Sequence, residues 1–233
     1  MTELIPRRVL AVRDRLTHAA HAASRNPRDI TLLAVSKAYD HTAVRAAALA
    51  GQRDFGENYL QEALDKQKAL ANPDLVWHFI GPIQSNKTRG IAENFAWAHS
   101  VDRLKIAERL SAQRPDGLPP LNVCLEVNIS GEASKGGATP DTLLQLAGQV
   151  ADLPRLCLRG LMAIPAPTPD PVQQRLAFQQ VRGLFDTLNA RGLSLDTLSM
   201  GMSGDFEAAI AEGSTLVRIG TALFGARHYP AAA

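Results

Sequence analysis

A lysine ends an apolar run near the start of the chain. Lys37 follows residues 31–36, which read TLLAVS and are typical of a buried strand. Lysine is rarely buried for packing, and burial disfavours its charged form, so its amine can become a nucleophile near neutral pH. Such an amine forms Schiff bases with aldehydes, including the aldehyde of pyridoxal phosphate (PLP). The alternative is that Lys37 lies just past the strand end, with its ammonium group in water.

Two glycine-bearing turns in the second half of the chain could bind an anion. They are 199–205, which reads SMGMSGD, and 217–221, which reads VRIGT. Glycine has no Cβ, so it lets backbone N–H groups approach a phosphate closely, and a helix starting near Gly204 would add its positive dipole end. The residues with this chemistry are Ser203, Gly204, Gly220 and Thr221. The alternative is ordinary turn glycines with capping serines, and Asp205 and Glu207 place negative charge in the same helical turn.

Short apolar runs alternate with helical patterns along the chain. The expected strands are 31–36, 52–55, 76–80, 95–99, 121–127, 156–162, 197–200 and 215–219. The expected helices are 4–23, 41–50, 58–70, 85–93, 103–113, 140–151, 173–191 and 204–212. This alternation predicts an α/β fold, a single (β/α)8 TIM barrel over 1–233 with an extra N-terminal helix. A doubly wound sheet is the alternative, but its Gly-rich turn after the first strand is missing.

Polar side chains gather where the expected strands end. A barrel of this kind builds its active site at the C-terminal ends of the strands. Lys37 follows the first strand, Asn58 follows the second, and His78 lies within the third. Met162 ends the sixth strand and Arg218 lies in the eighth, beside the two glycine-bearing turns. Since barrels commonly bind phosphate after strands seven and eight, the pattern predicts a small-molecule site at the barrel mouth.

The composition argues against several classes of protein. The chain has 233 residues, is 45% hydrophobic and carries a net charge of +2, which suits one large core and no nucleic-acid partner. The start lacks the apolar stretch of a signal peptide, and no run is long enough to cross a membrane, so we expect a cytoplasmic protein. Cys124 and Cys157 fall in apolar strand-like runs, and we expect both to be buried core residues. No metal-ligand spacing is present, so no metal site is expected.

Several segments together resemble the fold-type III PLP proteins, and within them the YggS/PROSC family of pyridoxal phosphate homeostasis proteins. The matching segments are 33–37 (LAVSK), 55–59 (FGENY), 77–87 (WHFIGPIQSNK), 127–128 (VN), 135–136 (KG), 160–162 (GLM), 199–203 (SMGMS) and 217–220 (VRIG). In combination these motifs are highly specific, and they extend over most of the chain.

The resemblance implies roles for the matching positions. Lys37 would carry PLP as a Schiff base, and Arg218 would face its pyridine nitrogen. The phosphate would be held at the two glycine-bearing turns, by Ser203, Gly204, Gly220 and Thr221. The ring pocket would be lined by Asn58, His78 and Met162. The cofactor would be solvent-exposed, and the protein would buffer PLP or deliver it to apo PLP enzymes without an established turnover.

Enzymatic alternatives stay open at this point. An arginine at the pyridine nitrogen disfavours its protonation and weakens the electron sink, which suits a carrier but is shared with alanine racemases of the same fold type. The racemases need a second acid/base, which in that family is a tyrosine from an additional domain. The tyrosines here are Tyr39, Tyr59 and Tyr229, and none matches by motif. A racemase of low activity and a PLP-free Schiff-base aldolase acting on sugar phosphates are the alternatives.

Two further expectations concern the barrel mouth. Lys135 is either a solvated loop lysine or a second amine that accepts the aldehyde during transfer. Because no additional domain would cover the mouth, we expect a monomer.

Overall fold

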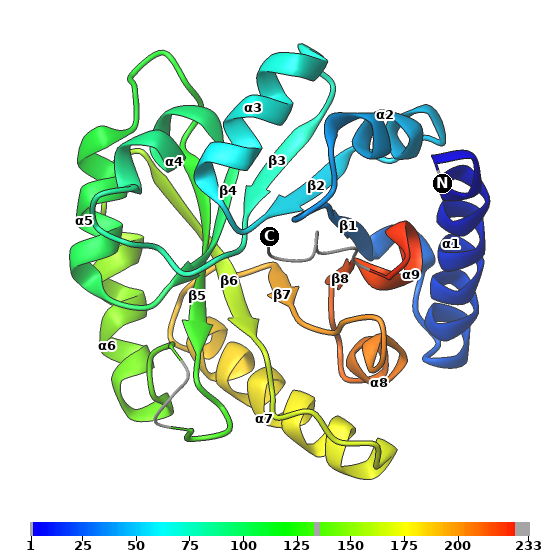
Figure 1. The fold of residues 1–233 in the computed structure, drawn as a ribbon. Coiled ribbons are helices and arrows are strands. Elements are labelled where there is room, and N and C mark those ends of the chain that lie inside the picture. The colour runs from blue at the N-terminus through cyan, green and yellow to red at the C-terminus, as the bar shows by residue number, and fades with distance from the viewer. Residues whose placement is uncertain (1, 133–135, 227–233) are drawn as a thin grey trace.

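Eight parallel strands close into a barrel in the order of the sequence (Figure 1). The computed structural model describes residues 2–132 and 136–226. The strands are β1 (Thr31–Val35), β2 (Asp54–Glu57), β3 (Val76–Phe79), β4 (Trp97–Val101), β5 (Leu121–Val127), β6 (Leu156–Ala163), β7 (Thr197–Ser199) and β8 (Leu216–Ile219). The predicted (β/α)8 barrel is therefore confirmed, and β1 pairs with β8 to close it.

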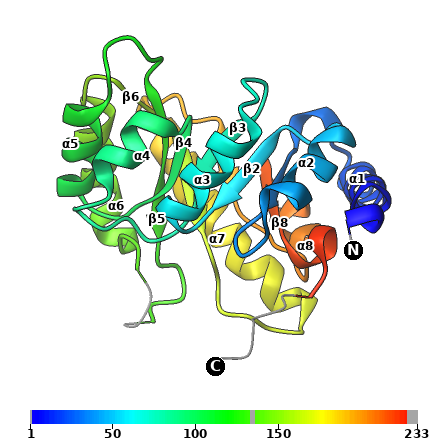
Figure 2. The same cartoon turned by 45° about the horizontal axis from the view of Figure 1, so that its top comes forward.

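Helices surround the barrel on its outside (Figures 1 and 2). They are α1 (Ile5–Ala22), α2 (His41–Leu49), α3 (Leu60–Leu70), α4 (Thr88–Asn94), α5 (Leu104–Gln113), α6 (Pro140–Ala151), α7 (Pro171–Ala190), α8 (Phe206–Ala211) and α9 (Thr221–Phe224). Short 3-10 turns lie at η1 (Thr2–Leu4) and η2 (Pro27–Asp29). Several ends have side-chain caps: Asp40 accepts hydrogen bonds from the N–H groups of Thr42 and Ala43 at the start of α2. The sequence pattern does not predict the short helix α9, which follows β8.

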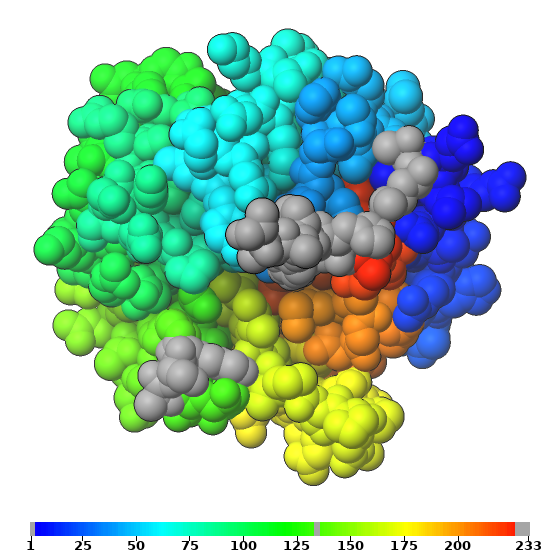
Figure 3. All heavy atoms as spheres, in the orientation of Figure 1, coloured from blue at the N-terminus to red at the C-terminus, as the bar shows by residue number. Residues whose placement is uncertain are grey.

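The extra N-terminal helix is α1, which covers one flank of the barrel. Its buried residues recur every three or four positions and are Ile5, Val9, Val12, Leu16 and Ala20. This face packs against α2, α8 and α9, and the space-filling view shows α1 in blue beside the orange and red segments (Figure 3). In the described part of the chain, no helix combines the length and apolar character that a bilayer span requires.

Two strands begin two residues later than the sequence predicts. The segment 52–53 belongs to the turn before β2, where the buried Gln52 amide donates to the carbonyls of Leu32 and Asp54. Phe95 does not start β4. It caps the end of α4, where its N–H donates a hydrogen bond to the Ile91 carbonyl. Apolar content alone does not distinguish a buried turn from a strand start. The shift places Glu57 inside β2 and His99 in the middle of β4.

One cysteine expectation is wrong. Cys124 is buried in β5, and burial raises the pKa of its thiol to about 12. Cys157 is exposed instead, because it lies in the first part of β6, where full burial begins only at Gly160. An apolar run therefore marks the strand correctly but not the depth of each residue within it.

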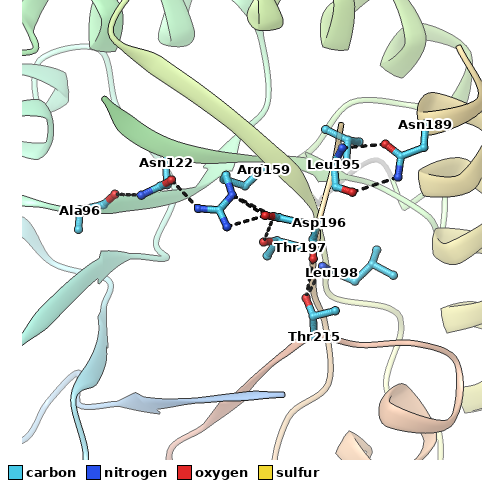
Figure 4. Close-up of polar contacts among 9 residues, drawn as sticks. All are labelled: Ala96, Asn122, Arg159, Asn189, Leu195, Asp196, Thr197, Leu198 and Thr215. Atoms are coloured by element: carbon cyan, nitrogen blue, oxygen red, sulfur yellow. Dashed lines mark hydrogen bonds and ion pairs between the residues drawn. The ribbon is translucent and has the colours of Figure 1, made fainter. Parts of the chain in front are cut away.

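The N-terminal ends of the strands are tied by a polar network (Figure 4). Arg159 in β6 donates to both carboxylate oxygens of Asp196, at 2.9 and 3.0 Å from Nε, and to Oδ1 of Asn122 in β5 at 2.8 Å. Its guanidinium also lies over the Trp97 ring. Arg159 thus links the starts of β4, β5, β6 and β7, which leaves the opposite end of the barrel for chemistry.

Candidate functional site

A cavity of about 260 Å³ opens at the C-terminal ends of the strands. We call it the C-terminal cavity. It is lined by Val35, Lys37, Asn58, Ile80, Ile164, Met202, Ser203, Gly204, Arg218, Gly220 and Thr221. Seven of the nine residues singled out in the sequence are in this lining, although they come from both halves of the chain. The volume lies just below the roughly 300–1,000 Å³ typical of pockets for drug-sized ligands, so it suits a small molecule.

Lys37 reaches this cavity from the turn after β1. It lies two residues past the strand end and is half-buried, so it is neither inside the strand nor fully in water. The next residue, Ala38, has φ of +66°, a left-handed conformation that is unfavourable for a residue with a Cβ. The Tyr39 hydroxyl donates to the Gly225 carbonyl at 2.7 Å, and its ring stacks on Phe224. The turn that carries Lys37 is thereby fastened to the segment after β8.

A buried ion pair lies directly beneath this turn. Lys66 in α3 donates to Oε1 of Glu57 at 2.7 Å and to the Ser36 carbonyl at 2.9 Å. The Ser36 hydroxyl donates to the same Glu57 oxygen. Burial raises the pKa of Glu57, while the Lys66 charge opposes that rise. Sequence reasoning missed Lys66, since a lysine on a helix facing the barrel wall looks like any surface lysine.

Asn58 approaches the cavity from the turn after β2. A Cβ on Gly81 would lie 2.5 Å from the Asn58 carbonyl oxygen, so only glycine lets the turns after β2 and β3 lie this close. Within the described residues, the buried Asn58 Oδ1 has no hydrogen-bond partner. A buried acceptor in this state favours a ligand that can donate to it.

The turns after β7 and β8 present donors to the cavity. The backbone N–H groups of Ser203, Gly204 and Thr221 make no hydrogen bond to other described residues. A Cβ on Gly204 would meet no atom within 4 Å, so the backbone there is accessible. Helix α8 begins at Phe206, later than predicted, and Asp205 turns inward to accept from the Met202 N–H at 2.6 Å. The free N–H groups and the hydroxyls of Ser203 and Thr221 fit an anionic group such as a phosphate.

Arg218 forms the floor of the cavity. It is 5% exposed and donates to the Ser199 carbonyl, to Ser199 Oγ at 2.9 Å, and to the Ala163 carbonyl at 2.9 Å. Burial lowers the pKa of Arg218 to about 10, and the carboxyl groups of Asp205 and Glu126 oppose that fall. The guanidinium is therefore still a cation at neutral pH, held in a fixed orientation.

His78 and Met162 do not belong to this lining. Met162 is 1% exposed and lies within β6. His78 lines a second cavity, of about 230 Å³, at the N-terminal ends of the strands, which we call the N-terminal cavity. The sequence placed His78 in the right strand, but the motif around it does not reveal towards which end of the barrel a ring in mid-strand points.

The apolar lining was also missed by sequence reasoning. Val35 is the last residue of β1, and Ile80 and Ile164 each follow the end of a strand directly. Their place beside a strand end is the signal that could have found them. They provide apolar walls for a flat ring, with the polar groups at its edges.

Other features of the surface are less suited to chemistry. A larger hollow of about 480 Å³ lies between α1 and α8, but its lining is mostly alanine, and its charged Arg15 and Glu207 pair with each other. In the described residues, no group of three or more His, Cys, Asp or Glu side chains could hold a metal ion. Lys135 and Tyr229 lie outside the described residues.

Comparison with known proteins gives consistent matches over nearly the whole chain. The family described as alanine racemase, N-terminal domain, matches residues 11–228. A pyridoxal phosphate homeostasis protein of Pseudomonas aeruginosa is 64% identical over 98% of both chains. The pyridoxal phosphate homeostasis protein of Escherichia coli K12 is 56% identical over 94% of both chains.

A solved structure has the same fold. PipY of Synechococcus elongatus, in a structure with PLP bound, is 38% identical and has a TM-score of 0.83, covering 95% of this chain and 100% of PipY. The structure of PipY without PLP has a TM-score of 0.84. The barrel, the matched residues and the level of identity agree. The chain therefore belongs to the alanine racemase N-terminal domain family and, within it, to the pyridoxal phosphate homeostasis proteins.

Proposed function

We propose that this protein binds PLP in the C-terminal cavity and acts in intracellular PLP homeostasis. One observation carries the proposal: an amine, a set of anion donors and a buried cation, from Lys37, the turns at Ser203 and Thr221, and Arg218, meet around one small cavity. Those three kinds of group can bind the aldehyde, the phosphate and the pyridine nitrogen of PLP. The PLP bound to the related PipY supports the same assignment.

Lys37 is the residue proposed to hold the cofactor covalently. Its Nζ would add to the aldehyde carbon, and loss of the carbonyl oxygen as water would leave a carbon–nitrogen double bond. The unbonded N–H groups at Ser203, Gly204 and Thr221, with Gly220 in the same turn, would hold the phosphate. Asn58 would reach the ring with its buried Oδ1, whereas His78 and Met162 would act only from outside the cavity.

Arg218 would keep the pyridine nitrogen unprotonated. PLP supplies an electron sink for carbanion chemistry, and that sink is strongest when the nitrogen carries a proton. A cationic guanidinium at that position opposes the proton, so bound PLP would be held with its reactivity reduced. This favours a carrier that buffers PLP or delivers it to apo PLP enzymes over an enzyme.

The positions of Tyr39 and Tyr59, the two tyrosines within the described residues, also favour a carrier over a racemase. A racemase needs an acid/base opposite the lysine, and neither Tyr39 nor Tyr59 lines the C-terminal cavity. Tyr39 donates to the Gly225 carbonyl, and Tyr59 is 58% exposed. Amino-acid racemisation by the loaded protein would contradict the carrier assignment.

The test is the visible absorption spectrum of the purified protein with added PLP, before and after borohydride. We expect a band that borohydride removes, with a reduced adduct on Lys37 detected by peptide mass spectrometry. K37A should lack both, and K105A, at an exposed lysine outside the cavity, should behave as wild type. If the wild-type protein gives no trapped adduct, covalent PLP binding is refuted, and sugar phosphates become the ligands to test.

Delivery, location and assembly are part of the same proposal. We expect a cytoplasmic monomer that passes PLP to an apo enzyme faster than free PLP at the same concentration would load it. Lys135 is proposed as a second amine in this transfer. Unchanged binding and release of PLP by K135A would remove that role.

A further inference from the structure

A row of polar side chains crosses the barrel interior between the two cavities. Oδ1 of Asp54, at the start of β2, lies 3.1 Å from Nε2 of His78. Nδ1 of His78 lies 3.0 Å from Nε2 of His99. Nδ1 of His99 lies 2.8 Å from Oγ of Ser199, which accepts from Nη1 of Arg218 at 2.9 Å. Arg218 lines the C-terminal cavity, whereas Asp54 and His78 line the N-terminal cavity.

The chemistry of the two ends determines the direction of every hydrogen bond in this row. An ionised carboxylate only accepts, so Nε2 of His78 carries the proton that is donated to Asp54. A neutral ring then has an unprotonated Nδ1, which accepts from Nε2–H of His99. By the same rule Nδ1 of His99 accepts from the Ser199 hydroxyl.

The Arg218 end of the row is consistent with the same donor and acceptor assignment. A guanidinium only donates, and Ser199 Oγ accepts from Arg218 while giving its single proton to His99. Every donor and acceptor in the row is therefore matched, with no proton left over. Burial lowers the pKa of His78, and lowers the pKa of His99 still further with help from the neighbouring Arg218 charge, so both rings are neutral at pH 7.

We propose that Asp54, His78, His99 and Ser199 are positioning residues that hold Arg218 in place through one directed hydrogen-bond chain. The effect on the cofactor rests on the proposed function, since Arg218 meets PLP only if PLP occupies the C-terminal cavity. The hydrogen-bond chain itself does not depend on the cofactor. It gives a reason why His78 and His99 are both buried inside the barrel.

Other groups near this hydrogen-bond chain do not change which atom donates and which accepts in each of its bonds. Trp97 stacks on His78 with centroids 5.4 Å apart and offers no acceptor. Arg159 is committed to Asp196 and Asn122. The charged and titratable groups that face this hydrogen-bond chain from neighbouring elements are Arg28, Asp29, Cys124, Glu126, Arg159, Asp196 and Asp205.

The first test is nitrogen NMR of the histidine rings in the full chain without PLP. We expect both His78 and His99 to carry a proton on Nε2 and none on Nδ1, with assignments made from H78Q and H99Q. A proton on Nδ1 of His99 would overturn the proposal, because Ser199 would then have no acceptor in the chain. This result does not depend on whether the protein binds PLP.

The second test uses two substitutions at one position. The shorter amide of H99N can place its Oδ1 where Nδ1 of His99 accepts from Ser199, whereas the longer amide of H99Q reaches only the place where Nε2 donates to His78. H99N keeps the acceptor for Ser199 and loses only the link to His78, so it should shift the Nη signals of Arg218 and weaken PLP binding less than H99Q does. H99Q should shift those signals and weaken PLP binding by about fivefold, as expected for one lost hydrogen bond.

A matched control separates positioning from general loss of packing. S111A removes another buried serine hydroxyl, one that donates to the Pro154 carbonyl on the barrel exterior, and should leave the Arg218 signals unchanged. Equal shifts in H99N and H99Q, or none in H99Q, would refute the positioning role. If the NMR shifts follow the prediction but the wild-type protein does not bind PLP, the proposed function fails and the hydrogen-bond chain to Arg218 still stands.

Discussion

A single buried ion pair supports the residue that carries the proposed chemistry. The side chains of Lys66 and Glu57 are only 7% and 0% exposed, and their hydrogen bonds meet at Ser36, next to Lys37. Removing charges from water is costly, and the cost is recovered only while both partners are present. The pair therefore acts less as a source of stability than as a constraint that holds the Ser36 backbone in one position.

Loss of one partner should be strongly destabilising. K66M would leave Glu57 buried without its cation, so we expect the free energy of unfolding to fall by about 3 kcal/mol. R89M, which breaks an exposed pair with Glu93 at a side chain that is 69% exposed, should cost no more than about 0.5 kcal/mol. Urea denaturation of both variants measures the difference, and similar losses for the two would show that the buried pair has no special weight.

At the scale of elements, the barrel depends on close packing of neighbouring strands. β6 and β7 approach at Gly160, where a Cβ would lie 1.7 Å from the Thr197 carbonyl oxygen. Real Cβ atoms cannot come so close, so any side chain there must push the two strands apart. The contact lies just above the Arg159–Asp196 link, and together they set the register between these strands.

Two glycine-to-alanine substitutions should therefore have opposite effects. G160A should lower the free energy of unfolding by about 3 kcal/mol or more, because the overlap is with backbone that cannot move aside. G183A, in the exposed middle of α7 with no atom within 4 Å of the new Cβ, should raise it by up to about 1 kcal/mol through helix propensity. Thermal unfolding of the pair gives the sign directly, and a stable G160A would mean that the strands can separate without loss.

For the whole molecule, the buried histidines make stability depend on pH. Folding lowers the pKa of His99 well below its ordinary value of 6.5, so on acidification the unfolded chain takes up the proton first. The His99 contribution to stability is therefore constant above about pH 6.5 and falls as pH drops from there towards the folded pKa. The raised pKa of Glu57 and of Asp205 acts in the opposite sense above about pH 4.5, so the wild-type curve alone is a mixture.

A comparison of variants isolates the histidine contribution. The free energy of unfolding of wild-type protein should fall more steeply than that of H99N between about pH 6.5 and 5, by up to about 1.4 kcal/mol per pH unit, because asparagine does not titrate. Chemical denaturation at several pH values measures both slopes. Parallel curves would show that His99 is not buried in the neutral form.

The barrel and most of its cavity could be predicted because both depend on local patterns. Apolar runs between helical stretches give the strand count, and the residue after each strand falls at one end of the barrel by geometry. That is enough to bring Lys37, Asn58 and Thr221 together from distant parts of the sequence.

The features that the sequence does not predict depend on how deeply a side chain is buried and on which way it points. Short sequence patterns do not encode either property. His78 and Cys157 lie in correctly predicted strands, yet the first points to the N-terminal cavity and the second to solvent. Lys66 is buried only because Glu57 falls inside β2, two residues from where the apolar pattern places the strand end. Such errors come from strand register, which is set by packing against the rest of the barrel.

Pairing of the first strand with the last has a consequence for synthesis. One part of the C-terminal cavity's lining follows β1 and the neighbouring part follows β8, and Tyr39 connects the two through its contacts with Phe224 and Gly225. While the ribosome is still making the segment 216–224, the turn that carries Lys37 lacks its neighbour in the barrel. The cavity proposed to hold PLP is therefore complete only when the ring of strands closes.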